Sequence, residues 1–407
     1  MASIRNPSSD LVTRLLVTKG LRAFGDGYVS LLLPLYLLEL GFSPLLVGVV
    51  ATVTLLGSGL LTLLVGLHAH RYRYRTLLLG ATALMAFTGL GFAVATSLWP
   101  LLLIALIGTL NPSGGDVSVF LPLEHAMLAR VVDDRRRTSM FARYSLVGSL
   151  LAAVGSLAAA VPTIVSDAAG VPMLTAMQAM FVLYALLAGV SAWIYRGLPR
   201  AMAADAQAPL AAPLVHARKR VYTLAALFSL DAFGGGFVVQ SMVALWLYRT
   251  YSLSAAVAGS LFFWAGVLTA FSYLAAARIA QRWGLVNTMV FTHLPSSLCL
   301  VAIPFVPSLG DVVALLLIRS ALSQMDVPTR SSYVMAIVPA AERAAAASVT
   351  SVPRSLASAV SPVLAGYLLA ASPFGWPFLI AGTVKIAYDL LLLGMFSKVR
   401  PPEETRP

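Results

Sequence analysis

The sequence predicts an all-α membrane protein with about twelve transmembrane helices, arranged as two pseudo-symmetric six-helix bundles. Three observations predict this fold class. Of the 407 residues, 59% are hydrophobic and only 11% are charged, against roughly 25% charged residues in an ordinary soluble domain. The apolar residues fall in runs of about 20, which is the length of helix that crosses a bilayer. The second half of the chain also repeats features of the first half at a nearly constant offset.

Charge clusters, Pro- and Gly-rich turns and polar loops divide the apolar runs into separate expected helices. Charged residues between Arg14 and Asp26 interrupt the first run, where a signal peptide would need an unbroken apolar core, so we expect this helix to remain in the chain. The expected spans are residues 15–40, 44–67, 75–97, 99–128, 139–165, 172–195, 221–248, 254–277, 287–306, 311–337, 345–371 and 376–396.

Lys and Arg gather in alternate loops, which is typical of the cytoplasmic segments of a membrane protein. If both termini are cytoplasmic, the outer loops carry only Arg249 and every basic cluster lies inside. The sequence therefore predicts a multi-pass protein of the cell inner membrane with both termini in the cytoplasm. This placement accounts for the net charge of +12, so we expect membrane lipids and no nucleic acid among the partners.

Cysteine and histidine usage predicts no disulfide framework and no metal site. Cys299 is a single cysteine inside an apolar run, and the five histidines show no metal-ligand spacing. The chain also lacks the phosphate-binding sequence G-x-x-x-x-G-K-[ST], so direct use of ATP is not expected. We therefore expect no cofactor, and a monomer whose partners are protons and a small-molecule substrate.

An internal repeat divides the chain into two halves. Residues 1–195 and 221–407 form the expected six-helix bundles, and the Pro-, Ala- and Arg-rich residues 196–220 form the expected cytoplasmic linker. Pairs of matching residues lie 209 to 211 positions apart: Gly27 with Gly236, Arg71 with Arg282, Asp116 with Asp326, and Arg143 with Arg354. A duplicated six-helix unit explains this spacing.

The loop after the second expected helix carries a recognisable pattern. It keeps a glycine and two arginines of the pattern G-x-x-x-D-R-x-G-R-[RK], with a histidine at the acidic position, and the second half keeps one arginine: Gly66, His70, Arg71, Arg75 and Arg282. The chain resembles the major facilitator superfamily over essentially its whole length. The resemblance rests on this loop, on the number of expected helices and on the linker between the two halves. The resemblance implies a loop that latches the two halves through its Asp, which His70 replaces here.

Ionisable residues inside the expected helices are candidate functional residues, because an isolated charge is costly in a bilayer. The substrate or proton-coupling candidates are Asp26, Asp116, Asp231, Asp326 and Arg330. The candidate structural or gating charges are Arg22, Glu124, Arg143, Arg319 and Arg354.

Local sequence distinguishes two of the acidic candidates. Asp26 lies between two glycines and could bind a proton, or it could form an i,i+4 ion pair with Arg22. Asp116 follows the sequence Asn-Pro-Ser-Gly-Gly, residues 111–115, which should loosen or kink the helix there. Such a break is tolerated at membrane depth where it lines a cavity or packs against protein.

The remaining charges allow structural alternatives. Asp326 and Arg330 are spaced as an i,i+4 ion pair, and so are Lys385 and Asp389. Glu124 could pair with Arg143 or with the basic cluster at 135–137. Ion pairs that support the bundle and charges that gate a pathway remain equally open at this stage.

The resemblance implies a secondary active transporter that works by alternating access, and we expect proton-coupled export of a small organic or toxic compound. The alternative is proton-coupled uptake of an organic anion or another small metabolite, which the buried arginines would suit. An intramembrane enzyme or a transporter-like sensor is disfavoured, because Glu124 and His125 are the one close pair of catalytic type and the loops are short. We therefore expect no catalytic residues.

Overall fold

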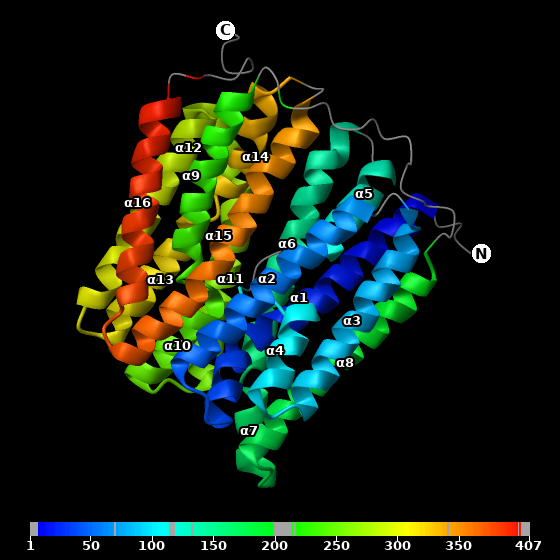
Figure 1. Ribbon diagram of the computed structural model, residues 1–407, viewed down its shortest axis with the longest axis vertical. Coiled ribbons are helices and arrows are strands. Elements are labelled where there is room, and N and C mark those ends of the chain that lie inside the picture. The colour runs from blue at the N-terminus through cyan, green and yellow to red at the C-terminus, as the bar shows by residue number, and fades with distance from the viewer. Residues whose placement is uncertain are drawn as a thin grey trace. The chain divides into compact units, whose positions relative to one another are not determined.

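The structure is a computed structural model that describes residues 7–68, 71–113, 119–131, 134–198, 214, 217–339, 342–397 and 399. Its regular elements are helices (Figure 1). In the first half they are α1 (Pro7–Glu39), α2 (Pro44–His68), α3 (Tyr74–Val94), α4 (Leu98–Ile107), α5 (Phe120–Val131), α6 (Asp134–Ala158), α7 (Val161–Ala169) and α8 (Met173–Arg196). In the second half they are α9 (Arg218–Gly236), α10 (Gln240–Tyr251), α11 (Ala255–Trp283), α12 (Leu285–Ala302), the short 3₁₀ helix η2 (Ile303–Phe305), α13 (Leu309–Leu322), α14 (Asp326–Ile337), α15 (Arg343–Ala371) and α16 (Trp376–Phe396).

The chain folds as two compact units. Unit 1 contains Met1–Phe42, Val53–Gln207 and Leu253–Phe263, and unit 2 contains Ser43–Thr52, Ala208–Ser252 and Trp264–Pro407. Most of the expected linker, residues 196–220, lies outside the described residues.

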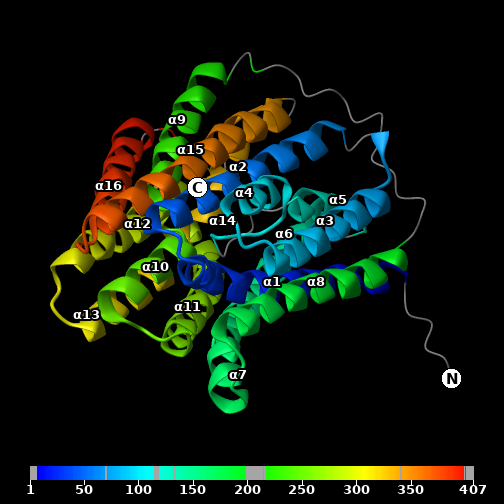
Figure 2. The ribbon, with the colours of Figure 1, turned by 60° about the horizontal axis from the view of Figure 1, so that its bottom comes forward.

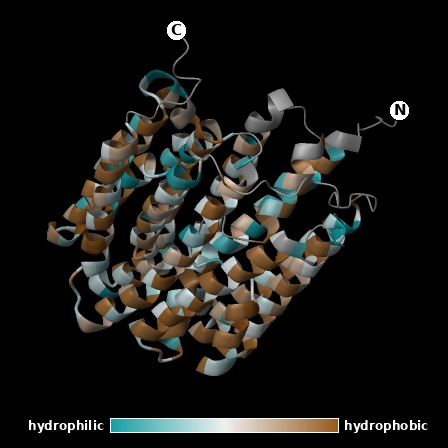
Figure 3. Ribbon diagram, turned by 45° about the horizontal axis from the view of Figure 1, so that its top comes forward, coloured by the Kyte–Doolittle hydropathy of each residue, from teal (hydrophilic) through white to brown (hydrophobic). Residues whose placement is uncertain are grey.

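The described residues include eleven helical stretches that are long and apolar enough to cross a membrane. Hydrophobic residues, brown in Figure 3, occupy most of their length. The chain is therefore a multi-pass membrane protein, as its composition predicts.

The fourth expected span differs from a continuous helix. Residues 99–128 were expected to cross the membrane together, but α4 ends at Ile107 and α5 begins at Phe120. Residues 108–113, which include Pro112, are not helical. The predicted loosening of the backbone is thus confirmed, because Asn, Pro, Ser and Gly are poor helix formers. Asp116 itself lies outside the described residues.

The tenth expected span has a break of the same kind. Residues 323–325 form a turn between α13 and α14. In each repeat, the helix that follows the break carries a residue of a buried charge network: Glu124 on α5 and Arg330 on α14.

Each unit has its own apolar core, which holds the helix after the break in place. In unit 1, Leu123 and Met127 of α5 pack with buried residues of α1, α3, α6 and α8. In unit 2, Tyr333 and Val334 of α14 pack with buried residues of α9, α12, α15 and α16. Figure 2 shows α1 and α8 of unit 1 lying side by side.

In each unit, glycines let two crossing helices touch through their backbones: α1 with α6 in unit 1, and α9 with α15 in unit 2. On α1 and α6, a methyl group at Gly27 would overlap the carbonyl of Ala152, and one at Gly155 would overlap the carbonyl of Phe24. On α9, a methyl group at Gly236 would meet Ser361 of α15. The absence of a side chain is therefore what lets the first helix of each repeat approach the fifth.

Candidate functional site

A buried network in unit 1 is centred on the carboxylate of Glu124, whose exposed fraction is 0%. Arg22 on α1 places Nη2 2.5 Å from Oε2 and Nη1 3.2 Å from Oε1 of this carboxylate. The hydroxyl of Tyr195 donates to Oε1 at 2.5 Å, that of Tyr144 to Oε2 at 2.5 Å, and that of Thr18 to Oε1 at 3.2 Å. Glu124 thus has one cationic partner and three hydroxyl donors, which compensates the cost of burying its charge.

Two pairings that the sequence left open as alternatives do not form in the described part of the chain, and the side chains at 135–137, another alternative partner of Glu124, lie outside what the structure describes. Glu124 pairs with Arg22 and not with Arg143, which is exposed on α6. Arg22 consequently does not pair with Asp26, although the two are spaced as an i,i+4 pair. The reason is geometric: α5 brings the carboxylate of Glu124 to the guanidinium, where a bidentate contact satisfies both groups.

Asp26 has a different environment from Glu124. The hydroxyl of Tyr184 donates to Oδ1 of Asp26 at 3.2 Å. Asp26 is half-buried on α1. It forms no ion pair with any of the described residues. Gly25 next to it allows this contact, because a side chain there would meet the ring of Tyr184. Lys19 and Arg22 lie within electrostatic reach of Asp26. In the described part of the chain, Asp26 thus has a hydroxyl donor and cations nearby, but no direct ion pair.

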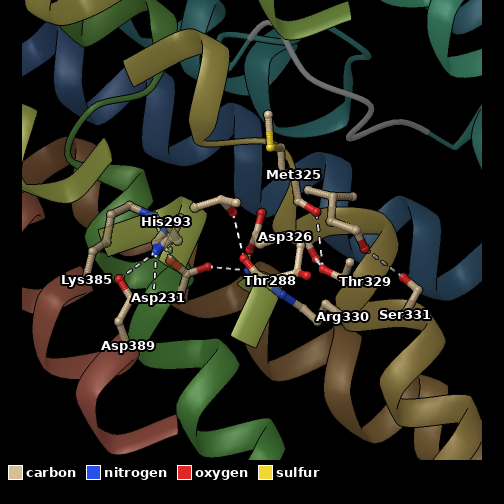
Figure 4. A network of polar contacts seen from close by, with 12 residues as sticks. Asp231, Thr288, His293, Met325, Asp326, Thr329, Arg330, Ser331, Lys385 and Asp389 are labelled. Carbon is tan, nitrogen blue, oxygen red and sulfur yellow. Dashed lines mark hydrogen bonds and ion pairs between the residues drawn. The ribbon is translucent and has the colours of Figure 1, made fainter. Parts of the chain in front are cut away.

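A second buried network lies in unit 2 and is centred on Asp231 of α9, which is 4% exposed (Figure 4). Nζ of Lys385 lies 2.6 Å from Oδ1 of Asp231, and Nη2 of Arg330 lies 2.8 Å from Oδ2. Arg330 also pairs with Asp326, as their i,i+4 spacing predicts. Three helices, α9, α14 and α16, are thus joined through one aspartate.

His293 of α12 completes this network. Its Nδ1 lies 2.9 Å from Oδ1 and 3.0 Å from Oδ2 of Asp389. Its Nε2 lies 3.5 Å from Oδ1 of Asp231 and 3.5 Å from Nζ of Lys385. The expected self-neutralising pair of Lys385 and Asp389 is therefore wrong, because the ammonium faces Asp231 and the carboxylate faces His293.

The other arginine candidates of unit 2 lie near this network. Arg354 on α15 is half-buried and within electrostatic reach of Arg330, Asp231 and Asp326. Arg319 on α13 is half-buried and within electrostatic reach of Asp231. Arg143 is the residue of unit 1 that matches Arg354 in the sequence repeat. Its environment differs, because Arg143 is exposed and Arg354 is half-buried.

The candidates of the loop pattern lie at the surface. Gly66, Arg71 and Arg282 are exposed, and Arg75 is half-buried near the start of α3. His70 lies outside the described residues.

Sequence reasoning missed His293 and the three tyrosines that donate to Glu124 and Asp26. The histidines were dismissed for lacking metal-ligand spacing, which is irrelevant to proton exchange. One signal could have identified His293: it lies on α12 in a polar stripe with Thr288, Thr292, Ser296 and Ser297, all of which are buried in a helix of otherwise apolar character. Nothing local marks the tyrosines.

Comparisons with known proteins cover most of the chain. The sequence matches the family model described as Major Facilitator Superfamily over residues 15–323 and 227–407. It is 24% identical over 410 residues to the uncharacterized membrane protein YJR124C of Saccharomyces cerevisiae, with 92% of each chain covered.

Two solved structures show the same fold at low sequence identity. The nucleoside transporter NupG has a TM-score of 0.71 at 15% identity and covers 95% of this chain and 99% of its own. The xylose transporter XylE from E. coli has a TM-score of 0.71 at 14% identity and covers 96% and 98%. The two carry differently named substrates, so this likeness establishes the fold and not a substrate.

Proposed function

Because this chain belongs to the major facilitator superfamily, we propose that it is a secondary active transporter that exports a small organic compound in exchange for protons. Alternating access, a location in the cell inner membrane, cytoplasmic termini and a monomeric state are parts of the same proposal. Members of the superfamily are transporters, and no enzymatic activity is proposed. The loop arginines and lipid headgroups would hold the cytoplasmic face at the membrane surface.

The observation that carries proton coupling is the environment of Asp26. A carboxylate within a membrane helix is held in its charged form by a direct ion pair. Lys19 and Arg22 act on Asp26 only from a distance, because none of the described residues forms an ion pair with it. The neutral carboxylic acid would still accept the hydrogen bond from Tyr184. Asp26 can therefore gain and lose a proton without breaking a buried ion pair. Asp116, which follows the sequence Asn-Pro-Ser-Gly-Gly at residues 111–115, is proposed as a second coupling residue.

The other two acidic candidates are less suited to this role as single groups. Asp231 is held by Lys385 and Arg330, and Asp326 is held by Arg330. Protonating Asp231 would leave the buried ammonium of Lys385 without its partner, which costs several kcal/mol. Protonating Asp326 would remove one of the two carboxylates that pair with Arg330. We propose that they hold the helices of unit 2 together.

Transport by purified protein in liposomes tests the proposal. A panel of neutral, cationic and anionic organic compounds is offered with and without an imposed pH gradient. We expect one class to accumulate only with the gradient, and Asp26→Asn to abolish this accumulation while exchange at equal pH continues. Asp167→Asn, which changes an exposed carboxylate on α7, is the matched control and should transport normally. Gradient-driven accumulation by Asp26→Asn and by Asp116→Asn would remove both residues from the mechanism.

One observation favours a second candidate function, the uptake of an organic anion. Nε and Nη1 of Arg330 and Nε of Arg319 are buried without a hydrogen-bond partner among the described residues. Guanidinium groups with free donors bind carboxylates and phosphates well. The anionic members of the same panel, supplied from outside, distinguish this function from export.

A further inference from the structure

The imidazole of His293 lies between two carboxylates and one ammonium group, and it is only 3% exposed. Nδ1 is within 3.0 Å of both oxygens of Asp389. When Asp389 is ionised, its carboxylate only accepts hydrogen bonds, and this contact then places a proton on Nδ1. In neutral His293, the proton therefore resides on Nδ1 and the lone pair on Nε2.

The surroundings of Nε2 suit both of its protonation states. Lys385 Nζ, a donor, and Asp231 Oδ1, an acceptor, each lie 3.5 Å from Nε2. When Nε2 is unprotonated, it can accept a hydrogen bond from Lys385. When it is protonated, it can donate to Asp231. A small movement toward one neighbour or the other is enough, so neither state leaves a buried polar atom without a partner (Figure 4).

The exchange of partners would also act on Lys385. The ammonium of Lys385 already donates to Asp231 at 2.6 Å. Protonation of His293 places a second cation beside the same oxygen and a positive charge 3.5 Å from the ammonium. Since α16 carries Lys385 and α9 carries Asp231, the gain of one proton weakens a link between these two helices.

Other charges also face this group. On α14, Asp326 and Arg330 adjoin Asp231, and α16 also contributes Tyr388, whose ring packs edge-on at 5.9 Å from that of His293. Arg319 on α13 and Arg354 on α15 lie within electrostatic reach of Asp231, and η2 contributes no charged group. The groups that face His293 therefore carry charges of both signs.

We propose that His293 is the proton-binding residue of unit 2 and that its proton exchanges the partner of Nε2 from Lys385 to Asp231. One proton from water binds the Nε2 lone pair, and the charge of the network rises by one. This inference rests on the proposed proton coupling and adds the residue that carries the proton in unit 2.

Solid-state NMR of the full chain in liposomes, labelled with ¹⁵N-histidine, tests the proposal without a substrate. The signal lost in His293→Gln should show Nδ1 protonated throughout and Nε2 changing reversibly between pH 5 and 9. Asp389→Asn should move this change to lower pH by about one unit or more, and Lys385→Met should move it to higher pH. The matched control is His125→Gln, a histidine of unit 1 stacked on Phe141, which should leave the signal unchanged.

Specific results would overturn the proposal. The proposal is wrong if the Nε2 signal stays constant over this pH range. It is also wrong if the signal changes at the same pH in Asp389→Asn and Lys385→Met as in the wild type. If His293→Gln fails to fold, the signal is assigned as the one that both of these variants shift.

Transport measurements keep this proposal separate from the proposed function. If the wild type is driven by a pH gradient, His293→Gln should lose accumulation and retain exchange at equal pH; retained accumulation contradicts the role of His293. If no compound responds to the gradient in the wild type, proton coupling itself fails, whatever the NMR titration shows.

Discussion

Arg22 on α1 and Asp231 on α9 lie 209 residues apart, at matching positions of the repeat that the sequence predicts, and carry opposite charges. Each is buried and reaches the helix that follows the break in its own unit. Arg22 pairs with Glu124 of α5 at an N···O distance of 2.5 Å, and Asp231 pairs with Arg330 of α14 at 2.8 Å. The link between the first helix and the interrupted span is therefore present in both units with its polarity reversed.

From this reversal we infer that the link itself, and not the sign of either charge, serves the fold. The helix after each break is short, with 12 residues in both α5 and α14. A short helix is marginal on its own and depends on tertiary contacts. A buried ion pair fixes its rotation and depth against the long first helix, in addition to the apolar packing around it.

We expect Glu124→Gln to lower the free energy of unfolding by about 3–5 kcal/mol, because Arg22 would remain as a buried charge without its partner. Unfolding by SDS in mixed micelles measures this change. Asp10→Asn is the control: Asp10 pairs with Arg14 at 2.7 Å in a partly exposed i,i+4 contact, which is worth about 0.5 kcal/mol or less. Equal losses in the two variants would contradict a structural role for the buried pair.

The pairing in unit 2 predicts strong energetic coupling between Lys385 and Asp231. We expect Lys385→Met and Asp231→Asn each to destabilise the protein, and the double variant to be less destabilised than the sum by about 0.5–3 kcal/mol. The comparison is the pair that sequence spacing favours, Lys385 with Asp389. Because their side chains bind other groups, their coupling should be clearly smaller, and the reverse order would refute the described network.

Sequence patterns predicted the broad fold because a bilayer imposes strong, local requirements. Runs of about 20 apolar residues, basic loops and a repeat offset each follow from membrane thickness or gene duplication. The break near Pro112 was also predictable, since poor helix formers stand in a row. The i,i+4 pair of Asp326 and Arg330 formed as expected, because both residues lie in the first turns of one helix.

Partners on other helices could not be predicted in this way. Glu124 lies 102 residues from Arg22, and Lys385 lies 154 residues from Asp231. Helix spacing suggested nearer partners for Arg22 and Lys385, and both suggestions were wrong. Which helices pack together decides such contacts, and a single sequence does not contain that information in its local pattern.

The crossing of α1 and α6 should be intolerant of any side chain at Gly155. We expect Gly155→Ala to destabilise the protein by about 1–3 kcal/mol, because the methyl group would meet backbone atoms of Phe24, which cannot rotate away. Gly189→Ala on α8 is the control, with open space around the position; it should be neutral or stabilising by up to about 1 kcal/mol. The difference in SDS unfolding between the two variants is the measurement.

The proposed topology predicts that position 205 is in the cytoplasm. Starting from Cys299→Ala, which removes the one cysteine of the chain, Asp205→Cys should react with a membrane-impermeant maleimide only after the cells are opened. A cysteine at Thr250, next to the outer-loop residue Arg249, should react in intact cells. Labelling of position 205 from outside would reverse the orientation proposed from the basic loops.

Asp26 should behave in the opposite way to Glu124 when its charge is removed. Asn keeps the shape and the carbonyl oxygen that accepts from Tyr184, and no described ion pair is broken. We therefore expect Asp26→Asn to leave the free energy of unfolding within about 1 kcal/mol of the wild type or to raise it, since a polar group costs less than a charge in a membrane helix. SDS unfolding at pH 8, where an accessible carboxylate is charged, gives the sharpest comparison with Glu124→Gln. A loss as large as that of Glu124→Gln would mean that Asp26 supports the fold through a charge partner, and its proposed role in proton coupling would then fall.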